Sequence, residues 1–466
     1  MKASFKTIWL LAGLGILLAM AAGCNDTLRQ FIVPIPPPTG DPANLAHAIT
    51  LSTNPAPTVP PSPGSDMHID VSGDTSAGIV PLGVNPVFLG KTSNRVFIIN
   101  SGDPVGPPVI EPTVSVYTAL LPQSALVSTI TLPATSTGQV AGATSSSGDL
   151  YIANSTSNNV DVISGGVLSV IATIPVGTHP VAIAGNAANN KIFVVNQGSN
   201  DVTEISAIDN TVIKPSIPVG NAPVWAVMST DGLFVFVVNQ GDGTVSVIDT
   251  SLDIVLPCAG TSCSGTAIKV GTTATPSPNF AFYEPTLRRV YVSNTGEGSI
   301  SVIKGNGFDL GSVPQVLPEK LKDVMVSGTP TSVTALSDGT RAYAALGNCP
   351  AGVNHTNIVA QAASCTGNLV SVIDALALTE KKTIPVGIGA ISIDASGDSS
   401  RVYVANAHDT VTGTSGTHTA GTISDIDTKT DSVVFVKLAP NQDPSCVASA
   451  TNFCATQIPF MVRTFP

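Results

Sequence analysis

Residues Pro180 to Pro223 read P-V-A-I-A-G-N-A-A-N-N-K-I-F-V-V-N-Q-G-S-N-D-V-T-E-I-S-A-I-D-N-T-V-I-K-P-S-I-P-V-G-N-A-P. The stretch holds four short runs rich in Val and Ile, separated by Gly, Asn and Asp: 181–184, 192–195, 202–208 and 211–219. β-Branched residues favour extended backbone, and Gly, Asn and Asp favour turns, so the stretch predicts four β-strands. The unit begins again at Pro223 with V-W-A-V-M-S-T-D-G-L-F-V-F-V-V-N.

The same unit recurs along most of the chain. Pro180 is followed sixteen positions later by Asn196, and Pro223 is followed sixteen positions later by Asn239. Five further copies, three with this spacing and two looser, lie at Pro278–Asn294, Pro330–Leu346, Ala390–Asn406, Pro86–Asn100 and Val140–Asn154. Seven copies with four strands each, at a period near that of Pro180 to Pro223, are typical of propeller blades. We therefore predict an all-β fold, a seven-bladed β-propeller of four-stranded antiparallel blades that spans residues 67–466.

The sequence leaves open which end of the chain closes the ring. Met67–Val71 predicts a strand, and the following I-V-P-L-G at 79–83 repeats the end of the unit, so the N-terminus is one candidate. Ser432–Leu438 predicts an outer strand for the seventh blade from its own repeat, which makes the C-terminal part the other candidate. Beyond it we expect an extension that carries a disulfide.

The N-terminus resembles a bacterial lipoprotein signal. Lys2 and Lys6 precede an apolar run at 8–20, and Ala21-Ala22-Gly23-Cys24 then supplies small residues before a cysteine. This pattern predicts a signal peptide at 1–24, lipidation of Cys24, and a chain exported to the periplasm or the cell surface. An ordinary signal peptide with an incidental cysteine is the alternative. Residues 25–66 are rich in proline and predict an extended linker.

The remaining six cysteines fall into close pairs. We expect the local disulfides Cys258–Cys263, Cys349–Cys365 and Cys446–Cys454, since each pair closes a short loop and export favours oxidation. There is no C-x-x-C, no haem-attachment motif and no H-E-x-x-H in the sequence, and we predict no cofactor.

The chain is acidic, with a formal net charge of −11. Twenty Lys and Arg residues among 466 make it a poor nucleic-acid binder, and we expect contact with the membrane only through the lipid on Cys24. We expect a monomer.

Three of the predicted loops are enlarged. Residues 101–112, 347–367 and 407–421 follow the second strand of blades one, six and seven, and these loops emerge on one face of a propeller. In a seven-bladed ring these blades are neighbours, so the three loops would form one surface. Loops on a rigid frame commonly carry binding.

The strand motifs V-F-V-V-N, V-Y-V-S-N and V-Y-V-A-N, followed by V-S-V-I-D and I-P-V-G, resemble the YVTN-repeat β-propeller family. The resemblance covers about residues 80–440. It implies an exported bacterial or archaeal propeller, related in form to seven-bladed lactonase-type propellers. It is specific for the fold and does not specify a function.

Candidate site residues are few. Repeated Asn residues (Asn196, Asn239, Asn294, Asn406) and Asp residues (Asp209, Asp249, Asp374, Asp427) end strands in several blades, which indicates a role in turns. His355, His408 and His418, with Asp409, lie in the loops of blades six and seven and could bind a metal, although exposed loop histidines are the simpler interpretation. No nucleophile motif such as G-x-S-x-G is present, so we predict no catalytic residue.

Two functions fit these patterns. The first is a non-enzymatic, lipid-anchored binding or scaffold protein of the cell envelope, whose enlarged loops bind a protein or glycan partner. The alternative is a lactonase-type hydrolase with its site in the central mouth of the propeller. That site needs ionisable residues near the inner strands, where Asp394 and Glu284 are among the few acidic candidates. The scarcity of such residues favours the first function.

Overall fold

The computed structural model describes residues 47–53, 63–71, 75–92, 95–103, 108–118, 125–258, 260–413, 416–438 and 458–465. The predicted signal peptide, Cys24 and the pair Cys446 and Cys454 lie outside the described residues. Within these ranges no helix is both long and apolar enough to cross a membrane.

The described strands form eight antiparallel sheets, which we number as blades along the chain. Blade 1 consists of β4 (Pro86–Lys91), β5 (Arg95–Asn100), β6 (Thr113–Thr118) and β7 (Leu126–Thr131). Blade 2 consists of β8 (Gln139–Thr144), β9 (Leu150–Asn154), β10 (Asn159–Ile163) and β11 (Val170–Pro175). Blade 3 consists of β12 (Pro180–Ala184), β13 (Lys191–Asn196), β14 (Asp201–Ser206) and β15 (Val212–Pro218). Blade 4 consists of β16 (Pro223–Met228), β17 (Phe234–Asn239) and β18 (Thr244–Asp249), with the short β19 (Ile254–Val255), β20 (Cys263–Ser264) and β21 (Ala267–Lys269) outside them.

The second half of the ring has the same plan. Blade 5 consists of β22 (Pro278–Glu284), β23 (Arg289–Asn294), β24 (Ser299–Lys304) and β25 (Lys320–Met325). Blade 6 consists of β26 (Ser332–Ala335), β27 (Arg341–Leu346), β28 (Leu369–Asp374) and β29 (Thr379–Pro385). Blade 7 consists of β30 (Ala390–Ala395), β31 (Arg401–Gly413), β32 (Gly416–Asp427) and β33 (Ser432–Leu438). Blade 8 consists of β34 (Ile458–Phe465), β1 (His47–Thr53), β2 (Ser65–Asp70) and β3 (Thr75–Pro81).

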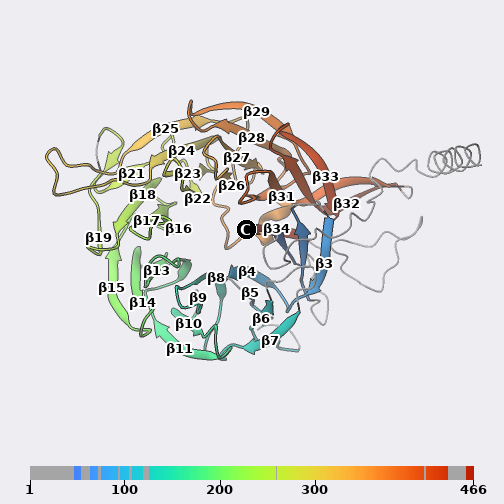
Figure 1. Cartoon of the computed structure of the whole chain (residues 1–466), viewed down its shortest axis with the longest axis horizontal. Helices are drawn as coiled ribbons and strands as arrows, with labels where there is room; N and C mark the ends of the chain where they lie inside the picture. The colour runs from blue at the N-terminus through green and yellow to red at the C-terminus, as the bar shows by residue number, and fades with distance from the viewer. Residues whose placement is uncertain are drawn as a thin grey trace, which may run out of the picture.

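The propeller therefore has eight blades among the described residues, and the prediction of seven was wrong (Figure 1). The seven predicted copies are blades 1 to 7. Blade 8 escaped the count because its strands come from both ends of the chain and do not repeat the motif that ends in Asn.

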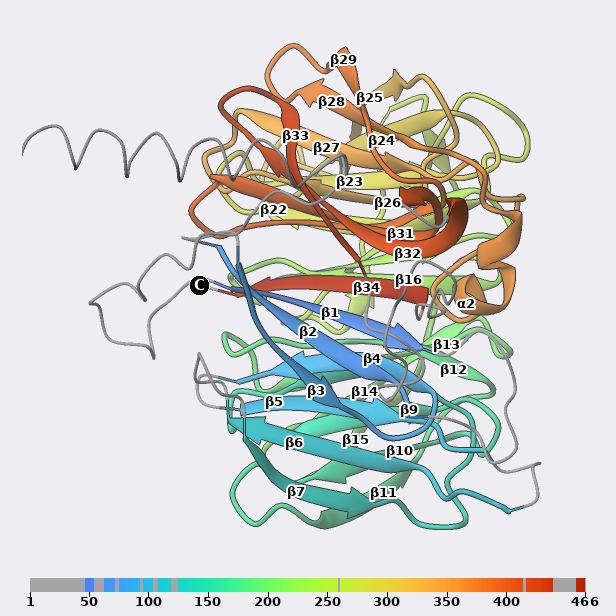
Figure 2. The same cartoon turned by 90° about the vertical axis from the view of Figure 1, so that its right-hand side faces the viewer.

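Both ends of the chain close the ring, which answers the question the sequence left open. Strand β34 is the innermost strand of blade 8 and pairs with β1, so the last described strand hydrogen-bonds to the first described one (Figure 2). β34 packs against β30 of blade 7, while β1 contacts β4 of blade 1. Strand β1 and the first two residues of β2 fall within the predicted linker 25–66, so the blades begin earlier than we expected.

Blades 7 and 1 are consequently not neighbours, because blade 8 lies between them. The loops of blades 6, 7 and 1 therefore do not come from three neighbouring blades, although Ser101 of the blade 1 loop and Thr356 of the blade 6 loop line one cavity. The enlarged loop of blade 7 is largely a hairpin, since β31 and β32 run on to Gly413 and Gly416.

The Asn that ends the second strand has a structural role in the blades. The side-chain amide of Asn239 donates to Thr244 Oγ1 and Ser246 Oγ on the third strand, both at 3.0 Å. Asn294 and Asn406 make equivalent pairs of bonds, and all three residues are fully buried. A Cβ on Gly220, in the I-P-V-G segment, would lie 2.5 Å from Asn239 Nδ2, so this approach requires glycine.

The repeated Asp residues hold the next turn. The Asp374 carboxylate accepts the backbone N–H groups of Leu376 and Ala377, and these bonds lower its pKa. Asp427 accepts the N–H groups of Lys429 and Thr430 in the same way. These carboxylates act in turns, as the sequence indicated.

Candidate site: the axial mouth and the blade 6 insert

The enlarged loop of blade 6, residues 347–367, folds over the mouth of the central channel, and we call it the insert. It contains the helical turn α2 (Ile358–Gln361) and the 3-10 turn η2 (Ala362–Ser364). α2 contacts β34, while η2 contacts β31. Buried apolar residues of the insert join one core cluster with blades 7, 8 and 1, namely Cys349, Val353, Ile358, Ala362 and Cys365.

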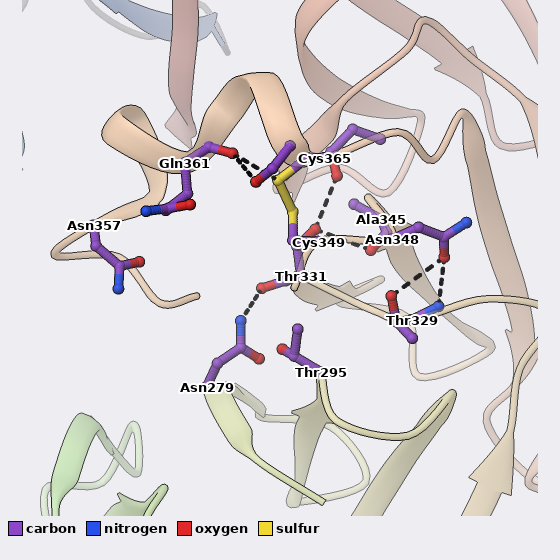
Figure 3. The surroundings of a disulfide bond; sticks show 12 residues. Asn279, Thr295, Thr329, Thr331, Ala345, Asn348, Cys349, Asn357, Gln361 and Cys365 are labelled. Carbon is purple, nitrogen blue, oxygen red and sulfur yellow. Dashed lines mark hydrogen bonds between the residues drawn. A yellow bond between two sulfur atoms is a disulfide. The ribbon is translucent and has the colours of Figure 1, made fainter. Parts of the chain in front are cut away.

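A disulfide closes the base of the insert. Cys349 follows β27 and Cys365 follows η2, and their Cα atoms are 4.1 Å apart (Figure 3). At the same base Asn348 Oδ1 accepts the N–H of Thr329 at 2.7 Å. The pairs Cys349–Cys365 and Cys258–Cys263 are bonded as predicted.

The tip of the insert contacts the neighbouring blade 5 and also blades 4 and 3, further round the ring. The N–H of Gly352 donates to Ser277 Oγ ahead of blade 5, at 3.2 Å, and Asn354 Nδ2 donates to Gln240 Oε1 of blade 4, at 3.4 Å. His355 Nε2 bonds to the carbonyl of Val181 in blade 3, at 2.7 Å. A loop that leaves blade 6 thus makes polar contacts with blades 3, 4 and 5.

His355 is held by specific contacts at the axis. Because a carbonyl only accepts, Nε2 carries the proton, and the buried Nδ1 atom has no hydrogen-bond partner among the described residues. Its ring lies edge-on to Trp225, with 4.7 Å between the centroids. Burial is the main cause that lowers the pKa of His355 to about 4, and the nearby charge of Arg463 contributes to the same shift. The insert therefore docks with a neutral histidine.

His355 separates two cavities. The first, of about 50 Å³, lies between five inner strands and the insert, and it is lined by Trp225, Asn279, Phe280, Thr331, Ser332, Asn354, His355, Ile358, Ile391, Ser392, Phe460, Met461 and Arg463. The second, of about 290 Å³, is more open and lies toward blades 1 and 2, with Ser101, Gly138, Gln139 and Thr356 among its lining residues. Small-ligand sites usually measure roughly 300–1,000 Å³, so His355 divides a space of ligand size.

The acidic candidates of the inner strands do not line either cavity. The Asp394 carboxylate accepts the N–H of Thr464 at 2.9 Å and the hydroxyl of Thr334 at 3.2 Å, and burial raises its pKa. Glu284 accepts the N–H groups of Thr286 and Leu287, which fixes the turn after β22. Both carboxylates hold backbone in place.

The histidines proposed as metal ligands lie in different settings. His408 packs near Gly389, and burial lowers its pKa. Asp409 accepts the N–H of Ile388 and the hydroxyl of Thr422. His418 pairs with Val411 in the hairpin of blade 7, and its side chain lies outside the described part. No three or more His, Cys, Asp or Glu side chains of the described residues are grouped to hold a metal ion.

Sequence reasoning missed Trp225, Phe280 and Arg463. Trp225 and Phe280 lie on the inner strands β16 and β22, within copies of the repeat, so the sequence does not distinguish them from ordinary core residues. Arg463 lies in β34, outside every repeat copy, although one arginine in the strand I-P-F-M-V-R-T-F is a usable hint.

Solved structures share the propeller fold at low sequence identity. The dihydro-heme d1 dehydrogenase NirN in complex with DHE is 12% identical, with a TM-score of 0.58 over 89% of this chain and 77% of that one. A Pseudomonas aeruginosa periplasmic gluconolactonase, PpgL, is 14% identical, with a TM-score of 0.50 over 73% of this chain and 95% of that one. A protein of unknown function from Desulfotomaculum acetoxidans is 13% identical, with a TM-score of 0.52 over 74% and 96% of the two chains. These likenesses show the fold alone.

No family model matches the chain, and no curated protein matches its sequence. The similarity to lactonase-like propellers in shape is confirmed, whereas membership of the YVTN-repeat family stays a prediction.

Proposed function

We propose that this chain is a non-enzymatic binding protein of the cell envelope, and that its ligand binds at the axial mouth where the insert lies. One observation carries the proposal: the insert crosses the mouth and seats His355 between Trp225 and the carbonyl of Val181. In that position the disulfide-closed loop lines both cavities through His355, so its position would set how much room a ligand has. The proposed binding site is therefore at the axis, and not on the surface of three enlarged loops that the sequence predicted.

The setting of this function is also a proposal. The N-terminal pattern supports export and a lipid on Cys24, which would tether a monomeric propeller to the membrane. A glycan or a protein that presents a small group to the mouth fits this location.

The test uses a built-in reporter. The chain has two tryptophans, Trp9 and Trp225, so a protein that starts at residue 25 keeps only Trp225, beside the candidate site. Because the Cα atoms of Cys349 and Cys365 are 4.1 Å apart, residues 350–364 can be replaced by two glycines without moving the base. A matched control replaces residues 311–314 of a blade 5 loop by two glycines, which keeps Phe308 on Phe234 and the hydrogen-bonded pair Asp309 and Val316.

The protein that starts at residue 25, called the parent, and both variants are used to capture molecules from the cell envelope. Each captured molecule is then added to each purified protein, and binding and Trp225 emission are measured. We expect at least one captured molecule to shift Trp225 emission in the parent and in the blade 5 control. The same molecule should not bind the variant that lacks residues 350–364. If that variant keeps every captured ligand of the parent, the mouth is not the site.

The alternative, a lactonase-type hydrolase, is supported by the fold likeness to the periplasmic gluconolactonase alone. Asp394 and Glu284 already hold backbone groups, which argues against it. Turnover of gluconolactone that is lost on chelation of divalent metal would establish this alternative instead.

A further inference from the structure

The smaller cavity carries a positive charge inside an acidic protein. Its thirteen lining residues include Arg463 and contain no Asp or Glu, although the chain has a formal net charge of −11. The other lining residues are apolar, aromatic, amide or hydroxyl side chains, and His355 is neutral near pH 7 because burial lowers its pKa to about 4. The cavity thus offers an anion one cation, and no carboxylate lines it.

Among the described residues, no carboxylate forms an ion pair or a hydrogen bond with Arg463. Its side chain is only partly buried. The charge of Arg463 acts to lower the pKa of Asp394, but the two Asp394 carboxylate oxygens accept hydrogen bonds from Thr464 and Thr334 instead. By contrast, Arg341 on β27 is paired with Asp431 at 2.6 Å. A guanidinium that faces a cavity without a partner is suited to a carboxylate, which it can hold with two parallel hydrogen bonds.

The rest of the cavity suits a short apolar group. Trp225 and Phe280 lie with their ring centroids 4.8 Å apart, and Phe460, Met461 and Ile391 complete an apolar lining. The free space of about 50 Å³ admits only a small molecule while the insert is docked. An anion without an apolar part would leave this lining uncovered.

We propose that this cavity binds a small organic monocarboxylate, with its carboxylate on Arg463 and its hydrocarbon part against Trp225 and Phe280. The inference names the ligand class for the site of the proposed function and rests on it. The same carboxylate belongs to a free acid or to the end of a larger molecule, and the small acids used below represent the shared chemistry.

The test compares straight-chain acids from propionate to hexanoate with the amide of each, by titration calorimetry and by Trp225 emission. We expect at least one acid to bind at least about tenfold more tightly than its amide, since a hydrogen bond to a charged group contributes about 1.5–3 kcal/mol. Arg463→Gln should remove this preference, and Arg463→Lys should keep part of it. Lys322→Gln, at an exposed position of the outer strand β25, removes a charge elsewhere and should change nothing.

Two results would overturn the assignment. One is equal binding of acid and amide, or no binding by any acid in the series. The other is a preference for the acid that survives in Arg463→Gln when the circular dichroism of that variant matches the parent. In either case a captured ligand that needs residues 350–364 would leave the proposed function intact, so the two failures are distinguishable.

Discussion

Replacing Val462 by Asp is expected to lower the free energy of unfolding by about 4 kcal/mol or more, enough to unfold a marginal protein. Val462 is fully buried in β34, in a cluster with Ala48, Met67 and Tyr403 that joins blades 7 and 8. Successive side chains of a strand point to opposite sides, so the cation Arg463 faces the axial cavity while a carboxylate at 462 would be desolvated between the two blades. Chemical denaturation followed by circular dichroism measures the effect.

The control places the same change on the outer edge of the ring. Val436→Asp lies on β33 at a side chain that is 42% exposed, and its effect should stay within about 0.5 kcal/mol. If Val462→Asp is as mild as Val436→Asp, then β34 is not an inner strand and the ring is not closed by the C-terminal segment.

Lowering the pH from 6.5 to 4 is expected to release the insert from the axial mouth. The pKa of His355 lies at about 4 in the docked state because of burial, and a free histidine has its pKa near 6.5. Between these values the released insert binds a proton that the docked insert does not, so docking weakens as the pH falls. The loss amounts to at most about 3 kcal/mol and is complete near pH 4.

Acrylamide quenching of Trp225 emission, in the chain that starts at residue 25, reports the release. Quenching should rise as the pH falls through this window in the parent. In His355→Phe, which keeps an aromatic ring on Trp225 and does not ionise, quenching should be independent of pH. A parent profile as flat as that of His355→Phe would show that His355 does not couple protonation to docking.

The sequence contained most of the fold, because the repeat is a local pattern. The spacing from Pro180 to Asn196 located blades 3 to 7, looser copies of the unit located blades 1 and 2, and Ser432–Leu438 was the outer strand of blade 7 as expected. Blade 8 was missed because its pairing joins β1 and β34 from opposite ends of the chain, and no local pattern records such a pairing. That one error also misplaced the predicted binding surface.

The site was less accessible to sequence reasoning. Residues 347–367 were predicted to form an enlarged loop on the face where the axial mouth lies, and His355 was named as a candidate metal ligand. Its observed contacts with Val181 and Trp225 depend on the path of the insert across the axis. Arg463 was overlooked since it lies outside the repeats, and that no described residue hydrogen-bonds to it can be seen only in the folded protein.

The central claim is that an insert from blade 6 crosses the axis to the opposite blades, and a crosslink tests it most directly. Thr356, at the exposed tip, lines one cavity together with Ser101 of blade 1. Thr356→Cys combined with Ser101→Cys, treated with a short bifunctional maleimide and digested, should give an intramolecular crosslink between these two positions. Thr356→Cys combined with Ser399→Cys, in the β30–β31 turn on the other face of the ring, should give none. No crosslink to position 101, with both cysteines shown to be reactive, would contradict the account.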